Sequence, residues 1–292
     1  MDISSFIATP GKPFKLNDFR TDDDGGFEKK EAKHQLKKDI ERISDLQYKL
    51  YAENRRALLI LFQAMDSGGK DSAIKHIMTG INPQGCEVTS FKHPSTQELE
   101  HNYIWRHYIH LPDRGRIGIF NRSVYENVLI TKVHPELILA ENLPGITKVK
   151  DITPAFWNRR YRQINQFERT VTENGTTILK FFLHLSRQEQ KERFLERIKN
   201  PDKNWKFSYG DIEERQYWDD YQRAYETAIN RTSTTFAPWY IIPADHKLYT
   251  HAIIGNIITE TLEKMNLQIP QPTQEDLDLL QKGKKELEAE ED

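Results

Sequence analysis

An apolar run over residues 57–65 leads directly into the glycine pair Gly68–Gly69, and a helical pattern follows over residues 70–78. The run is interrupted only by Gln63, which is typical of a strand buried on both faces. Such strands occur mainly in parallel sheets, whose connections need a crossover segment, usually a helix. The combination of strand, glycine turn and helix therefore restricts the chain to an α/β architecture.

Further apolar runs alternate with helical patterns along the chain. This alternation predicts one α/β domain with a mainly parallel, five-stranded sheet and helices on both faces. The other four expected strands are residues 86–91, 117–120, 176–185 and 239–242, and the expected helices include 96–110, 121–129, a helix from Pro154, a charged helix after 185, and 246–265.

The ends of the chain differ from its middle. Residues 1–55 form an N-terminal extension, in which apolar residues spaced three or four apart over 29–51 predict an amphipathic helix. Residues 56–269 form the main domain. Residues 270–292 form a tail with eight acidic against three basic side chains from residue 275 on, so we expect a solvated end.

The charges nearly balance, with 42 Lys and Arg against 44 Asp and Glu and a formal net charge of −2. This balance argues against a general nucleic-acid coat or a basic membrane-surface protein. The single cysteine, Cys86, excludes an intrachain disulfide and a cysteine-rich metal site. The N-terminus shows no secretory signal, and the longest apolar run is too short to span a bilayer. We therefore expect a cytoplasmic protein whose partners are neither nucleic acids nor membranes.

The loop after the first strand has the composition of a phosphate-binding loop. Glycines let successive backbone N–H groups point inward, the helix N-terminus adds positive potential, and Lys70 reaches the phosphoryl oxygens. The loop departs from G-x-x-x-x-G-K-[ST] because Ala64 replaces the first glycine and Asp71 takes the Ser/Thr position. A carboxylate beside phosphates needs a cation, so we expect Asp66 to hold Mg²⁺, with Mn²⁺ as a substitute. The expected phosphate-binding residues here are Ser67, Gly68, Gly69, Asp71 and Ser72.

This loop has a simpler interpretation, in which the two glycines only turn the chain and Asp66 caps the helix. A second polar group follows the strand at 117–120, and ligands bind at such strand ends in doubly wound sheets. Asn121 is expected to ligate or orient the metal, and Arg122 to stabilise transferring charge. Glu126 either binds a second cation through water or is a solvated surface acid. Tyr125 either flanks a nucleotide or packs in the core.

These motifs together resemble the polyphosphate kinase 2 family. The resemblance rests on A-M-D-S-G-G-K-D-S at 64–72, residues 92–106, I-G-I-F-N-R-S-V-Y-E at 117–126 and residues 189–206. It spans about residues 29–264, and the sequence departs from the family pattern at Val124 and Asn127. Two segments resemble the pattern of the subgroup that phosphorylates both AMP and ADP: Ala64-Met65-Asp66 and Phe120-Asn121-Arg122. The resemblance implies a P-loop kinase fold, Mg²⁺, a dimer or tetramer, and catalytic positions at Asp66, Lys70, Asn121 and Arg122.

A basic segment supports a polyanionic substrate. Residues 180–206 hold eight basic and four acidic side chains in a chain that is slightly negative overall. We expect a helical lid over about 186–230 that closes on the phosphates and supplies Arg193 to the transition state. The alternative is an ordinary surface helix whose glutamates pair with these bases. The other expected phosphate-binding residues are Arg106, Arg197, Lys203 and Lys206.

The sequence thus predicts a kinase that transfers the terminal phosphoryl group of inorganic polyphosphate to ADP and AMP, reversibly and without a covalent intermediate. Adenine nucleotides are the expected acceptors, with guanine nucleotides as a second possibility, and Arg122, Tyr125 and Glu126 are the expected nucleotide-binding residues. Two alternatives stay open. One is a nucleoside monophosphate kinase that uses ATP as donor, and the other is a non-catalytic polyanion-binding module with a degenerate phosphate loop.

Overall fold

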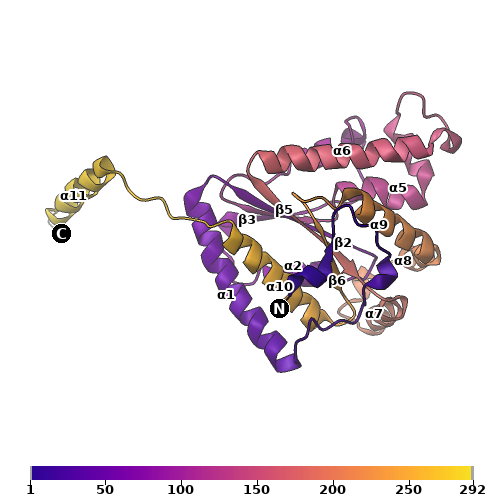
Figure 1. Cartoon of the computed structure of the whole chain (residues 1–292), viewed down its shortest axis with the longest axis horizontal. Coiled ribbons are helices and arrows are strands. Elements are labelled where there is room, and N and C mark those ends of the chain that lie inside the picture. Colours follow the sequence, from indigo (N-terminus) through magenta and orange to yellow (C-terminus); the bar gives the residue numbers. More distant parts are fainter. Residues whose placement is uncertain (1, 291–292) are drawn as a thin grey trace.

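The structure, a computed structural model, describes residues 2–290 apart from the side chain of Lys206. Within these residues six strands form one sheet in the order β1-β6-β5-β2-β4-β3 (Figure 1). Five are mutually parallel, and β1 pairs antiparallel with β6 at one edge. The strands are β1 Ile7–Ala8, β2 Ala57–Ala64, β3 Cys86–Ser90, β4 Ile117–Asn121, β5 Thr176–His184 and β6 Trp239–Pro243.

The prediction of a mainly parallel α/β sheet is confirmed, and the count of five strands is wrong by one. The additional strand, β1, spans two residues, which is too short for an alternating pattern to be recognised. It belongs to the N-terminal extension and therefore joins that segment to the main sheet.

Helices cover both faces of the sheet, as expected. Alternate side chains of β2 point to opposite faces, so Leu58 and Ile60 join the core under α1, α2 and α10, whereas Leu59 and Leu61 join the core under α6 and α9. This explains why every residue of β2 except Gln63 is apolar. The bounds are α1 Lys29–Glu53, α2 Lys70–Ile77, α6 Pro154–Glu173, α9 Trp218–Thr232 and α10 Lys247–Lys264.

The amphipathic helix of the N-terminal extension is confirmed as α1. Its apolar residues, including Ile43, Leu46 and Leu50, are buried together with Ile253 and Ile257 of α10. The apolar face of α1 is thus covered within the chain itself, so this face is not left over for a second subunit.

Two predicted helices are replaced by shorter elements. The helix expected over 96–110 is divided into α3 Thr96–Leu99 and α4 Trp105–Tyr108, because the side chain of Asn102 accepts a hydrogen bond from the backbone N–H of Ile104 (3.0 Å) and turns the chain. The helix expected over 121–129 is the 3₁₀ segment η4 Val124–Val128. Short helices then follow at α5 Ile130–Val133, η5 Pro135–Glu141 and η6 Val149–Asp151, and others lie at η1 Ile3–Phe6, η2 Leu16–Asp18 and η3 Pro83–Gly85.

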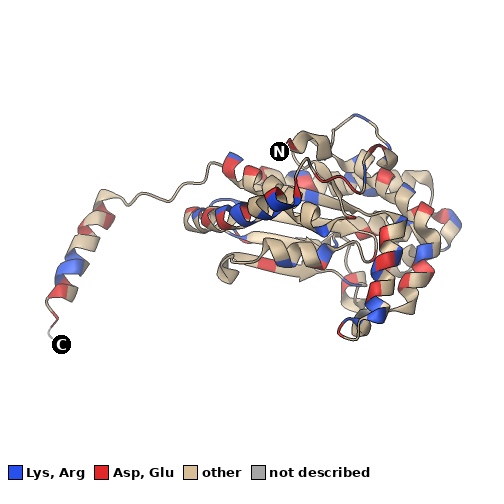
Figure 2. Ribbon diagram, turned by 90° about the horizontal axis from the view of Figure 1, so that it is seen from below, with Lys and Arg blue, Asp and Glu red and all other residues tan. Residues whose placement is uncertain are grey.

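The segment expected to form the lid is helical. It comprises α7 Arg187–Lys199, η7 Asn204–Lys206, α8 Tyr209–Glu214, η8 Arg215–Tyr217 and α9. After α10 the chain extends to α11 Gln274–Glu288, which stands apart from the body with basic and acidic side chains in solvent (Figures 1 and 2). Among the described residues, no helix has both the length and the apolar character needed to cross a membrane.

Candidate active site

The glycine loop joins the carboxyl end of β2 to the first residue of α2. Ser67 and Gly69 have positive φ values of 59° and 97°. A Cβ at Gly68 would lie 2.5 Å from the Cβ of Ala64 and 2.8 Å from the carbonyl of Met65, so no larger residue fits. This tight return of the chain explains the glycine pair.

Lys70 lies over this loop. Its side chain is buried, and its Nζ donates to the carbonyl of Ala64 at 2.9 Å. Burial, followed by the charge of Arg122, lowers the pKa of Lys70, while the carboxylates of Asp66, Glu126 and Asp71 oppose that shift. A buried ammonium at a glycine loop that opens a helix is suited to an anionic ligand.

The residues after β4 meet the loop from the neighbouring strand. Arg122 Nη2 lies 3.1 Å from Asp66 Oδ1, and Asn121 Nδ2 donates to Asp71 Oδ1 at 2.9 Å. The carboxyl ends of β2 and β4 therefore bring four predicted residues together.

The backbone at Arg122 is strained, with φ at 65° in a non-glycine residue. Its N–H donates to the carbonyl of Phe62 at 3.0 Å. The side chain of Gln63, buried in β2, binds the residues that follow Arg122. In the orientation that gives both its oxygen and its nitrogen a partner, the amide accepts from the N–H of Ser123 at 3.0 Å and donates to Glu126 Oε1 at 2.9 Å. The one polar residue in the apolar run thus positions the turn that carries Arg122.

The lid helix α7 lies against the same loop. Arg193 Nη1 donates to the carbonyl of Ser67 at 3.0 Å, and Arg197 Nη2 donates to its hydroxyl at 2.7 Å. Gln190, which the sequence analysis missed, donates to the carbonyl of Asp66 at 3.0 Å. Two of the four predicted lid bases and the loop therefore form one cluster. Both bases also pair with acids, Arg193 with Glu189 at 2.7 Å and Arg197 with Asp211 at 3.1 Å, so the pairing expected of an ordinary surface helix is present as well.

The remaining predicted phosphate-binding residues lie elsewhere. Lys203 pairs with Glu196 on the lid surface at 2.6 Å, and the hydroxyl of Ser72 lies 3.4 Å from Nε2 of His251 on α10. Arg106 is buried and pairs with Glu98 at 3.2 Å. The side chain of Lys206 lies outside the described residues. These contacts do not bring Lys203, Ser72 or Arg106 to the loop.

A cavity of about 200 Å³ lies beside Arg122. Glu126 and Arg106 line it together with Arg122, so Arg106 belongs to this cavity. None of the other lining residues was assigned to the site from the sequence, although Asn127 directly follows Glu126 and residues 92–106 carry part of the resemblance; they include Phe91, Lys92, His93, Tyr103, His107, Asn127 and Glu141.

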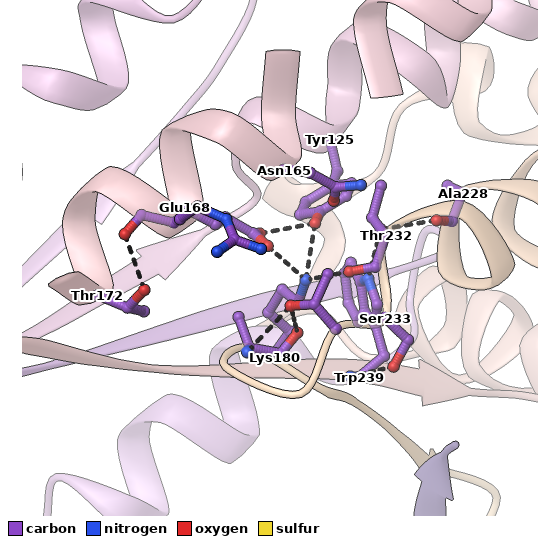
Figure 3. Close-up of polar contacts among 12 residues, drawn as sticks. Tyr125, Asn165, Glu168, Thr172, Lys180, Ala228, Thr232, Ser233 and Trp239 are labelled. Atoms are coloured by element: carbon purple, nitrogen blue, oxygen red, sulfur yellow. Dashed lines mark hydrogen bonds and ion pairs between the residues drawn. The ribbon is translucent and has the colours of Figure 1, made fainter. Parts of the chain in front are cut away.

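Tyr125 does not line this cavity, which corrects the expectation that it flanks a nucleotide. Its side chain is fully buried, and its hydroxyl donates to Glu168 Oε1 at 2.6 Å (Figure 3). Lys180 of β5 donates to Glu168 Oε2 at 2.6 Å, to the Tyr125 hydroxyl at 2.9 Å and to the carbonyl of Thr232 at 2.8 Å (Figure 3). The ammonium is therefore fully satisfied inside the core.

The sequence contains a signal for this network. Lys180 lies within the apolar run of β5, and a charged residue in a strand buried on both faces needs a buried partner. Burial lowers the pKa of Lys180 and raises the pKa of Glu168, and the charge of each partner opposes the shift of the other. The partner on α6 cannot be identified from spacing alone.

The chain is similar to known proteins over nearly its whole length. The family model described as Polyphosphate kinase 2 (PPK2) matches residues 26–270. An ADP-polyphosphate phosphotransferase of Rhodopseudomonas palustris is 50% identical, with 92% of each chain covered. An AMP/ADP-polyphosphate phosphotransferase of Meiothermus ruber is 45% identical, with 92% of this chain and 96% of the relative covered.

A solved structure agrees with this similarity. The crystal structure of Polyphosphate Kinase 2 from Arthrobacter aurescens TC1 superposes with a TM-score of 0.83 at 36% identity, covering 91% of this chain and 90% of the other. Fold, loop chemistry and sequence similarity therefore agree, and the chain belongs to the polyphosphate kinase 2 family.

Proposed function

We propose that this protein transfers the terminal phosphoryl group of inorganic polyphosphate to ADP and to AMP. The observation that carries this proposal is the convergence of Lys70, Arg122, Arg193 and Arg197 on one glycine loop, beside a cavity for an acceptor. Four cations around one loop match a phosphoryl donor with a charge on every unit. The names of the two relatives support polyphosphate as donor and both nucleotides as acceptors.

The residues imply a direct in-line transfer. An acceptor phosphate is already ionised at neutral pH, so its oxygen needs no general base to become a nucleophile. Arg122 lies both at the cavity and 3.1 Å from Asp66 of the loop, so it is positioned between acceptor and donor. There it stabilises the charge that develops on the transferred group, while Lys70 and Arg193 hold the donor.

The donor atoms around the loop fit a divalent cation of the Mg²⁺ class. Among the described residues no group of three His, Cys, Asp or Glu side chains is close enough to hold an ion alone. That matches Mg²⁺ in kinases, which is bound by one or two carboxylates, substrate phosphates and water. Asp66, with the amide oxygen of Asn121, would hold it, and Mn²⁺ accepts the same ligands. When bound, the cation neutralises phosphate charge. Besides Asp66, Glu126 is a second carboxylate whose charge acts on both Lys70 and Arg122.

Changing Asp66 to Asn removes the carboxylate and keeps the shape of the side chain. We expect kcat to fall roughly 10³-fold with an unchanged melting temperature, because the carboxylate that would hold the charge-neutralising cation is lost. The measurement is ATP formation from ADP over a Mg²⁺ titration, with Asp278→Asn in α11 as a charge-matched control. Near-normal turnover of Asp66→Asn at saturating Mg²⁺ would contradict the metal-ligand role.

The donor distinguishes this proposal from an ATP-dependent monophosphate kinase. We expect purified protein to form ADP from AMP with polyphosphate as the sole phosphoryl donor, and more slowly or not at all with ATP as the sole donor. Product formation with ATP alone would support the monophosphate kinase. Polyphosphate binding without any transfer would support the non-catalytic module. Three expectations stay predictions: adenine or guanine nucleotides as acceptors, a homodimer or homotetramer, and a cytoplasmic location.

A further inference from the structure

A second groove of about 360 Å³ lies away from the active site, and we call it the arginine groove. One wall is a single face of α6, and the other is the last turn of α9 with the segment that joins it to β6. This segment precedes the first residue of β6, whereas the glycine loop follows the last residue of β2. Because β2 and β6 run in the same direction, the groove lies at the amino ends of the strands and the glycine loop at their carboxyl ends. The groove is lined by Asn158, Tyr161, Arg162, Asn165, Gln166, Arg169, Arg231, Thr234 and Phe236.

The arginine groove has three guanidinium groups and no carboxylate in its lining. Within residues 2–290, Arg162 and Arg231 have no ion-pair partner. Arg169 approaches the exposed Glu173 at 3.6 Å and lies over the ring of Phe236, 4.9 Å from its centroid. The three arginines share one concave surface whose lining contains no acid, so the groove is a local excess of positive charge.

A buried hydroxyl in the groove also lacks a partner. Tyr161 is 4% exposed, and its Oη has no hydrogen-bond partner among the described residues. Burial raises the pKa of Tyr161 to about 12, with the nearby charge of Arg231 opposing the shift. The hydroxyl therefore keeps its proton at neutral pH and is a donor without a partner, while Asn165 Oδ1 in the same lining is an acceptor without one. An unsatisfied donor beside unpaired guanidinium groups indicates an anionic, oxygen-rich ligand.

We propose that the arginine groove binds a distant segment of the same polyphosphate chain whose terminal unit is in the active site. This inference rests on the proposed function, because it takes polyphosphate as the donor. A chain held at a second point has a higher effective concentration at the first, without a new contact there. The groove does not suit single-stranded nucleic acid, because its aromatic residues give no stacking surface: Tyr161 is buried and Phe236 is covered by Arg169.

The test uses donors of different length on the full chain. In the double variant Arg162→Gln/Arg231→Gln we expect the KM for long-chain polyphosphate to rise roughly fivefold to tenfold, with kcat unchanged. The KM for tripolyphosphate, which is too short to reach both sites, should stay the same. The salt dependence of the long-chain KM should also become shallower, because fewer counterions are released. The charge-matched control is Arg55→Gln/Arg114→Gln, two exposed arginines outside the groove.

Two results would overturn the arginine groove as a polyphosphate site. One is an unchanged long-chain KM, and the other is an equal rise in KM for both donors, which would place the effect in the active site. Calorimetric binding of long-chain polyphosphate without nucleotide separates this question from turnover. If the wild-type protein transfers no phosphoryl group, weaker long-chain binding by the groove variant still supports the site, whereas equal binding removes it.

Discussion

Replacing Lys70 with methionine lowers kcat roughly 10³-fold, because this ammonium is the cation that the fold places directly over the glycine loop. The methionine side chain fills a similar space and is apolar, so a position that is 9% exposed accepts it without a buried unpaired charge. We therefore expect the loss in activity to occur without a loss in stability.

Lys75→Met is the matched control, since Lys75 is an exposed lysine on the same helix, five residues further on. Initial rates with ADP and polyphosphate, measured with the melting temperatures of both variants, distinguish the two positions. A loss of less than tenfold in Lys70→Met, or an equal loss in Lys75→Met, would contradict the role of Lys70 at the phosphates.

Lys180→Met should destabilise the fold by about 3–5 kcal/mol, the usual effect of removing one partner from a buried ion pair. Glu168 would lose the ammonium that compensates its charge in a fully buried position, and the hydroxyl of Tyr125 would lose the ammonium that donates to it. Urea unfolding at pH 7 gives the free energy of unfolding. Because Tyr125 follows Arg122 by three residues, we also expect lower activity in this variant.

The double variant Lys180→Met/Glu168→Met tests the origin of that effect. An apolar pair removes both charges, so we expect the double variant to recover much of the stability lost in the single variant. If the single variant loses less than about 1 kcal/mol, the ion pair does not stabilise this core in the way that its geometry implies.

The parts of the site that follow from local patterns could be predicted from the sequence. The carboxyl ends of parallel strands meet at one end of the sheet, so the residues after β2 and β4 were expected to come close: Arg122 contacts Asp66, and Asn121 contacts Asp71. Arg193 and Arg197, both expected in a lid over the phosphates, contact the same residue of the glycine loop, Ser67.

Pairings across the fold could not be predicted in this way. Lys203 pairs with Glu196, as the alternative of a surface helix allowed, but the charge pattern does not show that Arg197 contacts the loop while Lys203 lies on the surface. Tyr125 follows Arg122 in a polar motif, but the 3₁₀ turn points it inward to Lys180. The break at Asn102 depends on one side-chain hydrogen bond, which apolar spacing does not reveal. Each of these outcomes depends on a partner that is distant in sequence or on the geometry of one turn.

The most direct test of the central claim is to supply the wild-type protein with long-chain polyphosphate as the sole phosphoryl donor, Mg²⁺, and either ADP or AMP. We predict ATP formation from ADP and ADP formation from AMP, both lost in Lys70→Met. Turnover with ADP alone would keep the polyphosphate-dependent kinase and contradict the use of AMP. No turnover with either nucleotide, in protein shown to be folded, would contradict phosphoryl transfer from polyphosphate at this site.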